Sequence, residues 1–455
     1  MFTKSLPYII LSVLISFIST EEILFAWEMH RHGARAPFKG VVGGVDAYKE
    51  NWTQIQELSD VGKRMLYLLG AKVRKRYVDQ YHLINGNYDP QEVYIRSTDV
   101  NRTLESVASF LQGLFPEGTG PILSEKIANI TNITYPPNIK YQKEFDEILK
   151  KYNLNTTNAA LPYQMSFEPV HLFYKPKHEF QLYDAEICKG HQEIYKKQQV
   201  RKEILDFGDE LNQKIPMLKQ LEGTTNDTFL RDYWVLYKYM DGFVCDDVDQ
   251  RNFSYIKEKY NYDDETRDLL RKYSKQYLWM DYSDTNYPKG YDNISIVANS
   301  YTIHSIINWM EQAIKKSQEK KTYIKLVIYS AHDASIGALE AFMRYVFNTE
   351  MDYCNFAESR YFELYKDNSG EYKVRYITGN NTAKMEKPFE EFKRIMNEKT
   401  WDDDKVNKYC QFTKEDDGQK KEGSKVTFYL LFVFGGIDLV ILMILIILCI
   451  KNKKE

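Results

Sequence analysis

The chain has 455 residues, 43% of them apolar, and a formal net charge of -3 at pH 7. This length and apolar content suit a large folded core, either one big domain or one domain with an insertion. Acidic and basic residues are interspersed and no long basic block precedes the C-terminus, which argues against nucleic acid as a partner.

Both ends of the chain carry targeting signals. Lys4 and the apolar run after it predict a secretory signal peptide over residues 1–20, with an uncleaved signal anchor as the alternative because the cleavage site is weak. Residues 426–450 are apolar with one charge, which predicts a single transmembrane helix. A polar stalk over 413–425 precedes this helix and a cytoplasmic tail over 451–455 follows it, so the predicted topology is single-pass type I.

Cysteines and glycosylation motifs fit a lumenal or extracellular chain. Four of the five cysteines lie outside the predicted membrane helix, an even number that allows two disulfides in three connectivities. Their spacings are too wide for a compact zinc site, and we expect no metal. The candidate N-glycosylation sites are Asn51, Asn129, Asn132, Asn155, Asn226, Asn252, Asn293 and Asn380.

The first third of the chain alternates between predicted strands and helices. The apolar run over 23–29 predicts a buried strand, and the motif R-H-G-A-R-A-P follows it at 31–37. Ser59 is the expected N-cap of a helix whose apolar residues recur at helical spacing over 65–77.

A second strand and helix follow in the same third. Residues 93–95 predict a short buried strand that ends at Arg96. Either Thr98 or Asp99 is the expected cap of the next helix, which closes near Phe115.

The middle of the chain, over 140–290, has a different composition. It is rich in Lys, Glu, Asp and Tyr, and the stretches over 197–219 and 264–279 predict long helices. No strong strand alternation is visible there, so we interpret this region as a mostly helical inserted domain.

The alternation of strands and helices returns after the insertion. The predicted elements are a helix over 301–315, a strand over 323–329, a helix over 334–342 and an antiparallel pair over 362–365 and 372–377. The complete pattern predicts an α/β fold, namely an open mixed sheet with helices on both faces. Residues 21–139 and 291–412 form this core, and the smaller, mostly helical domain is inserted between them.

Polar side chains follow three of the predicted strands. In open α/β sheets a ligand lies outside the carboxyl ends of the strands, so we expect these side chains to surround one anion. Guanidinium forks suit a phosphoryl group, and a neutral imidazole is a competent nucleophile for phosphorus. The candidate residues are Arg31, His32, Arg35, Arg96, His332 and Asp333.

These residue types predict a specific reaction. His32 attacks the phosphoryl group to form a phosphohistidine, and Asp333 gives a proton to the leaving alkoxide. A carboxyl that faces a phosphate anion has a raised pKa, so acidic pH favours the reaction. This chemistry needs no metal and no cofactor.

Three blocks of the sequence resemble the histidine acid phosphatases, branch 2 of the histidine phosphatase superfamily. They are R-H-G-A-R-A-P, the stretch over 58–118 that contains V-Y-I-R-S-T-D-V-N-R-T, and Y-S-A-H-D-A-S-I at 329–336. The chain looks most like the lysosomal and prostatic members. The resemblance implies that His32 is the nucleophile and Asp333 the proton donor, with a phosphate-binding set of Arg31, Arg35, Arg96 and His332.

The resemblance also carries structural expectations. It implies an α/β core with a smaller helical domain, a homodimer, and the disulfides Cys188–Cys410 and Cys245–Cys354. The residue after His32-Gly33 is Ala34, where the mammalian relatives have an aspartate, and this departure leaves the substrate preference open.

The sequence therefore predicts a membrane-anchored acid phosphatase that acts on small phosphate monoesters. Its catalytic domain is expected in a lysosome-like compartment, in the secretory pathway or at the cell surface. A phytase or another specialised phosphatase of the same fold is the alternative, and pocket residues from the insertion would decide between them. A catalytically silent surface receptor is the alternative from another class, and the intact set of six polar residues argues against it.

Overall fold

The computed structural model describes residues 21–37, 56–116, 202–248, 263–270, 272–273, 293–350, 354–379 and 381–412, together with residues 119, 151, 170–172, 188–190 and 192. The predicted signal peptide, stalk, membrane helix and tail lie outside these residues. Within the described part, no helix is long and apolar enough to cross a membrane. Of the predicted glycosylation sites, Asn226 and Asn293 are described and exposed, and the others lie outside the described residues.

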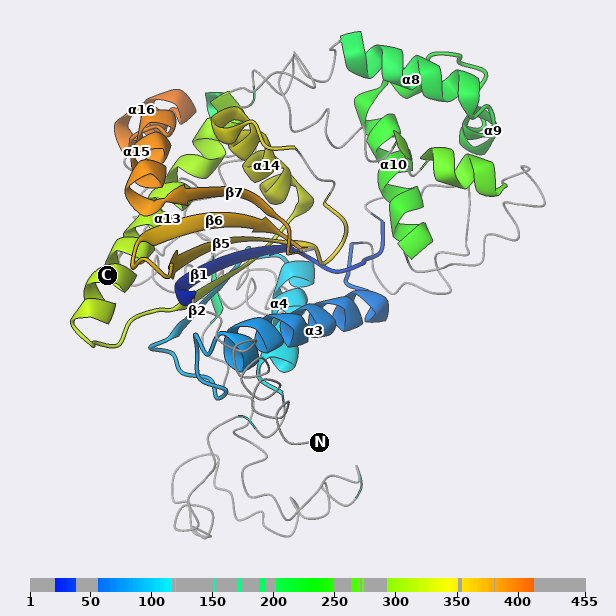
Figure 1. Ribbon diagram of the computed structural model, residues 1–455. Helices are drawn as coiled ribbons and strands as arrows, with labels where there is room; N and C mark the ends of the chain where they lie inside the picture. Colours follow the sequence, from blue (N-terminus) through cyan, green and yellow to red (C-terminus); the bar gives the residue numbers. More distant parts are fainter. Residues whose placement is uncertain are drawn as a thin grey trace, which may run out of the picture.

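The described strands form one seven-stranded sheet in the order β3-β2-β4-β1-β5-β6-β7 (Figure 1). The first four strands in that order run parallel, and the last three are antiparallel, so the predicted mixed sheet is confirmed. The strands are β1 (Glu22–Arg31), β2 (Val93–Ser97), β3 (Val170–Leu172), β4 (Leu326–Ala331), β5 (Ser359–Lys366), β6 (Tyr372–Thr378) and β7 (Ala383–Pro388).

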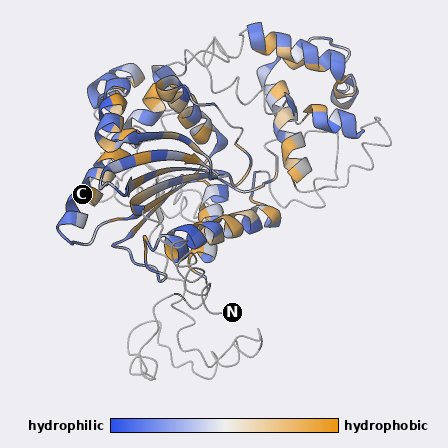
Figure 2. Cartoon of the chain, viewed as in Figure 1, coloured by the Kyte–Doolittle hydropathy of each residue, from blue (hydrophilic) through white to orange (hydrophobic). Residues whose placement is uncertain are grey.

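Helices cover both faces of this sheet, as predicted (Figure 1). One face carries α3 (Asp60–Arg74), its π-helical continuation η1 (Lys75–Gln80) and α4 (Asn101–Leu114). The other face carries α13 (Asn293–Gln318), α14 (Asp333–Phe347) and α15 (Phe389–Lys399), followed by α16 (Asp403–Cys410). Figure 2 shows hydrophobic and hydrophilic residues alternating along the helices, as expected for helices that are buried on one side.

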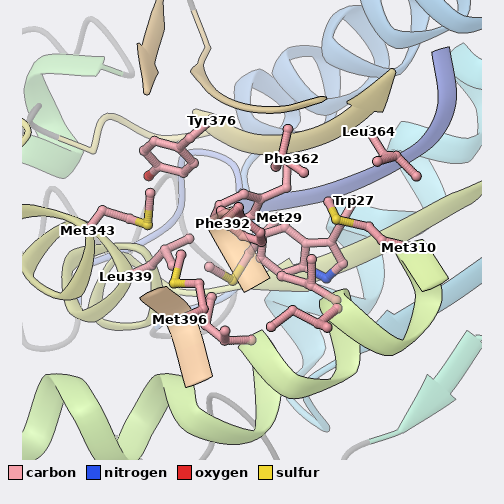
Figure 3. Close-up of a cluster of buried hydrophobic side chains, with 14 of the residues drawn as sticks. Trp27, Met29, Met310, Leu339, Met343, Phe362, Leu364, Tyr376, Phe392 and Met396 are labelled. Atoms are coloured by element: carbon pink, nitrogen blue, oxygen red, sulfur yellow. The ribbon is translucent and has the colours of Figure 1, made fainter. Parts of the chain in front are cut away.

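Strand β1 is largely apolar, and both of its faces are buried. Trp27 and Met29 point into the core beneath α13, α14 and α15, where they meet Phe362 and Leu339 (Figure 3). Ala26 points the other way, into the core under α3 and α4. A central strand covered on both faces needs a nearly continuous apolar run, which is the pattern that predicted it.

The inserted region forms a helical cluster with a core of its own. Its described elements include α8 (Lys202–Lys214), α9 (Met217–Glu222), the 3-10 turn η4 (Phe229–Arg231) and α10 (Tyr233–Val248). Residues 264–270 and 272–273 are also helical, within the helix predicted over 264–279. The single helix predicted over 197–219 is interrupted at Pro216, because proline cannot donate the hydrogen bond that a continuous helix requires.

The structure contains one short strand, β3, that the sequence did not predict. This strand lies within 140–290 but pairs in parallel with β2 at the edge of the core sheet. A strand of three residues is too short to show the alternation by which strands are recognised in a sequence.

One of the two predicted disulfides is present. Cys188 and Cys410 are bonded across a sequence separation of 222 residues. The prediction of a Cys245–Cys354 bridge is wrong, because both residues are buried and neither is disulfide-bonded. Each sulfur contacts another group instead. Cys245 Sγ lies 3.6 Å from Arg35 Nη1, and Cys354 Sγ lies 3.6 Å from the carbonyl oxygen of Asn355.

Candidate active site

The parallel pairing of β1 with β4 brings two predicted site segments together. Arg31 and Ala331 are paired at the ends of these strands, and the amide of His32 donates to the carbonyl of Ala331 over 3.0 Å. A histidine directly follows the last residue of each strand, and the ring centroids of His32 and His332 lie 5.7 Å apart. The register of the central sheet therefore creates the histidine pair.

A close backbone contact holds the loop after β1 against the start of α3. A Cβ atom at Gly33 would lie 2.4 Å from the carbonyl oxygen of Gly62, so only glycine fits there. Ser59 caps α3 by accepting from the amide of Gly62, as predicted, and its own amide donates to the carbonyl of Ala34. The amide of Gly33 donates to Ser106 Oγ of α4, so two helices fix the loop that carries His32.

The surroundings of His32 fix both its tautomer and its charge. Its Nδ1 lies 2.9 Å from the carbonyl oxygen of Gly33, which can only accept, so Nδ1 carries the proton and Nε2 keeps a lone pair. Burial first, and then the charges of Arg35, Arg102 and other site groups, lower the pKa of His32 well below its usual value. The imidazole is consequently a neutral nucleophile even at acidic pH.

Arg31 is held by three groups around its guanidinium. Its Nη2 lies 2.7 Å from Asp333 Oδ2, and its Nη1 donates to the carbonyl of Cys354 over 2.8 Å. The guanidinium also stacks 4.1 Å from the ring centroid of Phe356, which in turn lies beside His32. These contacts fix the direction of the fork and link both predicted catalytic residues through one arginine.

Arg35 is paired with a carboxylate from helix α10. Its Nη1 and Nη2 lie 3.2 Å and 2.7 Å from the two oxygens of Asp241 on α10, and Nη1 also donates to the carbonyl of Ala36. Arg35 is 4% exposed and the Asp241 side chain 8%, so this ion pair is almost completely shielded from water. Figure 1 shows α10 reaching the loop that follows β1.

The structure corrects the prediction for Arg96, which it does not bring to this cluster. Arg96 is paired with Tyr329 inside the sheet, and Tyr329 is paired with Met29, so Arg96 lies three residues below the level of His32. At about 3.3 Å per residue this separation is about 10 Å along the strands. Arg96 also shares a face of β2 with Tyr94, which packs on Trp309 of α13.

Arg102 supplies the third guanidinium instead. It is the second residue of α4, and its Nη2 lies 3.5 Å from His332 Nδ1. Its charge is among the largest influences on the pKa of both His32 and His332. Burial, and then repulsion by Arg35, lower the pKa of Arg102 to about 10, which leaves it charged at any physiological pH. The sequence signal is that Arg102 begins a helix at the carboxyl edge of the sheet, whereas Arg96 lies within a strand.

Hydroxyl groups orient His332. Thr103 Oγ1 donates to backbone carbonyls of Thr98 and Val100, and it lies 2.7 Å from Thr98 Oγ1, which must therefore donate to it. Thr98 Oγ1 then accepts from His332 Nε2 over 2.9 Å. This chain of donors leaves the lone pair of His332 on Nδ1, facing Arg102.

Sequence reasoning missed this role of Thr98. It predicted Thr98 or Asp99 as the cap of α4, but the N-cap is Val100, without a side-chain hydrogen bond. The Thr98 hydroxyl is engaged by His332 and Thr103 instead. No local pattern in the sequence identifies either this contact or the approach of Asp241 to Arg35, because both partners lie far apart in the chain.

Asp333 begins α14 directly after His332. Its Oδ1 accepts from the amide of Ala334 over 2.8 Å, and its Oδ2 meets Arg31. Burial raises the pKa of Asp333, but Arg31, followed by Arg35 and His332, outweighs burial and leaves the pKa below its ordinary value. The sequence predicts a raised pKa for Asp333 when it faces a bound phosphate anion. In the free site the neighbouring positive charges dominate, so the pKa of Asp333 is lowered instead.

The site is thus a cluster of three guanidiniums, two neutral imidazoles and two carboxylates at the carboxyl edge of the sheet. Within the described residues, no group of three or more His, Cys, Asp or Glu side chains could hold a metal ion. The Nε atoms of Arg35 and Arg102 are buried, and neither has a hydrogen-bond partner in the described part of the chain. Such an arrangement can bind a small anion through arginine donors and present it to the Nε2 lone pair of His32.

Comparison with known proteins agrees with this geometry. The model of the histidine phosphatase superfamily (branch 2) matches residues 22–378. The lysosomal acid phosphatase of Xenopus laevis is 25% identical over 390 residues, covering 84% of this chain and 76% of the relative. The prostatic acid phosphatase of Bos taurus is 26% identical over 371 residues, covering 80% of this chain and 79% of the relative.

Solved structures show the same fold. The apo phytase of Hafnia alvei matches with a TM-score of 0.52 at 13% identity, covering 87% of this chain and 99% of the phytase. The phytase of Klebsiella sp. ASR1 matches with a TM-score of 0.53 at 12% identity, covering 84% of this chain and 96% of the phytase. The chain belongs to branch 2 of the histidine phosphatase superfamily, a family of hydrolases that act on phosphate monoesters.

Proposed function

We propose that this protein is an acid phosphatase that hydrolyses phosphate monoesters through a phosphohistidine at His32. The observation that carries the proposal is the hydrogen bond from His32 Nδ1 to the carbonyl of Gly33, because it leaves Nε2 as the nucleophilic atom. The lowered pKa of His32 keeps that lone pair available at acidic pH.

The arginines bind the substrate and stabilise the transition state. Arg31, Arg35 and Arg102 donate to the nonbridging oxygens, with His332 beside them, and their charges balance the negative charge of the transferring phosphoryl group. His32 Nε2 forms a bond to phosphorus while the bond from phosphorus to the ester oxygen breaks. Preorganised donors need no reorientation during this step, and the contacts of Arg31 and Arg35 with buried partners support that role.

Asp333 supplies the proton for the leaving group. A bound phosphate dianion opposes the positive potential that lowers the Asp333 pKa in the free site, so binding of substrate moves this pKa upward. The protonated carboxyl then gives its proton to the leaving alkoxide. In the second half of the reaction the Asp333 carboxylate takes a proton from water, which attacks the phosphohistidine and releases phosphate.

The direct test is phosphate release from an aryl phosphate between pH 3 and pH 8 by the purified full-length protein. We expect activity on the acid side that is insensitive to a chelator, and its loss in His32→Ala. Acid quench of the wild-type reaction should trap labelled phosphate on His32. Full activity of the His32→Ala protein would refute the mechanism, and loss of activity with chelator would refute its independence of metal.

The proposal places the enzyme in the lumen, anchored by the predicted helix over 426–450. Support comes from the apolar composition of that segment and from the similarity to lysosomal and prostatic acid phosphatases. A homodimer is the further expectation from that similarity.

The two alternative functions have less support. A phytase is supported by fold alone, because the phytase structures are only 12–13% identical to this chain. A silent receptor is disfavoured because His32 and Asp333 are both present and share contacts with the arginines around them.

A further inference from the structure

One carboxylate of the inserted domain has no role in the mechanism above. Asp241 reaches the site from α10 and forms a two-point ion pair with Arg35. Its charge also acts on Arg102, and Tyr237 lies one helical turn earlier on α10. Asp241 therefore pairs with one of the three guanidiniums proposed to hold the phosphoryl group and acts electrostatically on a second.

The ion pair leaves Arg35 able to bind a phosphoryl oxygen at the same time. Asp241 occupies one N–H on each Nη atom, and Ala36 takes the second N–H of Nη1. A guanidinium has five N–H donors, so the Nε–Nη2 edge of Arg35 is left. Its Nε is buried without a partner among the described residues. Asp241 thus remains in place, as a fixed negative charge, when the anion binds.

A count of charges shows how much anion the site can neutralise. The described cluster contains the guanidiniums of Arg31, Arg35 and Arg102 and the carboxylates of Asp333 and Asp241. Both histidines are neutral in the free site, so the net charge is about +1. When Asp333 is protonated the net charge of this described cluster is about +2, which matches one phosphate dianion with no excess for a second.

Other described side chains of α10 that pack near the site are apolar. Val244, Cys245 and Val248 of α10 pack with Ala34 and Phe356 in one small hydrophobic cluster. Phe356 also lies beside the ring of His32, so this cluster adjoins the nucleophile. Among the described residues, a leaving group near α10 would meet this apolar cluster, the Tyr237 side chain and the Asp241 carboxylate.

We propose that Asp241 is a specificity-determining residue that selects monoesters with a single phosphoryl group and an uncharged or cationic leaving group. The inference rests on the proposed phosphatase function. Asp241 repels a second phosphoryl or carboxylate group of the substrate and leaves the reacting phosphoryl group to the arginines. Inositol polyphosphates are consequently poor substrates, although the fold is shared with phytases.

The first measurement uses the wild-type, full-length protein and three alkyl monophosphates of similar leaving-group chemistry. O-phosphoethanolamine has a cationic leaving group, glycerol 3-phosphate a neutral one, and 3-phosphoglycerate an anionic one. We expect kcat/KM at pH 5 to fall in that order, with at least a tenfold loss from the first to the last and still lower values for inositol hexakisphosphate. Equal values for the three, or preference for the anionic compounds, would overturn the proposal.

The second measurement compares variants by the ratio of kcat/KM for inositol hexakisphosphate to that for phenyl phosphate. Asp241→Asn removes the charge with little change in shape and should raise this ratio about tenfold or more. Asp241→Glu keeps the charge and should keep the wild-type ratio. Asp209→Asn is the matched control, because Asp209 lies in the same domain in an exposed ion pair with Arg231.

The outcomes separate this inference from the proposed function. Failure of wild type to hydrolyse any of the monoesters would refute the phosphatase function. Normal hydrolysis of phenyl phosphate with an unchanged ratio in Asp241→Asn would refute only the role of Asp241. Calorimetric titration of the His32→Ala protein, with and without Asp241→Asn, gives a readout without turnover. In this background, Asp241→Asn should tighten binding of inositol hexakisphosphate far more than binding of inorganic phosphate. Equal effects on both ligands would contradict the proposed selectivity of Asp241.

Discussion

The sharpest prediction concerns two arginines: the structure has Arg102 in the site, where the sequence predicted Arg96. Removal of Arg102 should abolish most of the activity, and removal of Arg96 should leave most of it. A guanidinium about 4 Å from a phosphoryl group contributes about 4 kcal/mol at an effective dielectric constant of about 20. Since each 1.4 kcal/mol corresponds to a factor of ten, Arg102→Ala should lower kcat/KM by about a thousandfold.

The expectation for Arg96 follows from its register in the sheet. Arg96 lies level with Met29 and Tyr329, so about 10 Å of strand separates it from the level of His32. At that distance the interaction falls to about 0.4–1.7 kcal/mol for dielectric constants between about 80 and 20. Arg96→Ala should therefore cost between about twofold and about fifteenfold in kcat/KM.

The assay is steady-state hydrolysis of an aryl phosphate by the full-length protein and its Arg96→Ala, Arg102→Ala and Arg102→Lys variants. Arg102→Lys keeps the charge without the fork and should recover part of the loss. Circular dichroism and Tm verify that each variant is folded. A loss for Arg96→Ala as large as that for Arg102→Ala, or a loss below threefold for Arg102→Ala, would refute the reasoning from register.

Three further predictions concern positioning, pH and packing. Thr98→Val removes the hydroxyl that accepts from His332 Nε2 and should lower kcat/KM about tenfold, whereas Thr98→Ser keeps the hydroxyl and should keep kcat/KM near the wild-type value. Equal activity of the Val and Ser variants would argue against the role of the hydroxyl chain. Because the pKa of His32 is lowered in the folded state, His32 adds stability above pH 6.5 that is lost as pH falls, by about 1.4 kcal/mol per pH unit. The decline of Tm between pH 7 and pH 5 should thus be shallower in His32→Asn, and an unchanged slope would contradict a buried neutral imidazole. Gly33→Ala would place a Cβ 2.4 Å from the Gly62 carbonyl oxygen and should cost about 3 kcal/mol or more in denaturant unfolding. Gly86→Ala should be tolerated, because its Cβ would meet the flexible end of Arg74 at 3.3 Å and make an ordinary contact with Val78 at 3.6 Å.

Much of the fold could be predicted because the signals are local. The apolar run of β1, the Ser59 cap of α3 and the strand β4 before His332 appear in the structure close to their predicted positions. Each depends on periodicity or capping within a dozen residues, where propensity and burial agree. The short strand β3 was missed because its stability comes from pairing with β2, which lies about 75 residues earlier in the chain.

The cysteines show the same limit. An even number outside the membrane helix indicated two bridges, and the family resemblance implied the partners. Only Cys188–Cys410 is formed, because bridging requires two Cβ atoms within about 4.5 Å and this proximity is a property of tertiary packing. Alkylation in denaturant without reductant should therefore label Cys245 and Cys354 and spare Cys188 and Cys410. If Cys245 and Cys354 were protected from alkylation, the predicted Cys245–Cys354 bridge would be present after all.

The sequence by itself determined which chemistry is available at this site. A histidine between two arginines at the end of a buried strand, and a second histidine followed by an aspartate at the end of another, specify phosphoryl chemistry by residue type alone. Tertiary structure decided which side chains complete the site. The register of β2 against β4 leaves Arg96 below the site, the start of α4 brings Arg102 into it, and α10 adds Asp241. These choices depend on distances between segments far apart in the chain, and such distances are set only when the sheet, its helices and the inserted domain pack together.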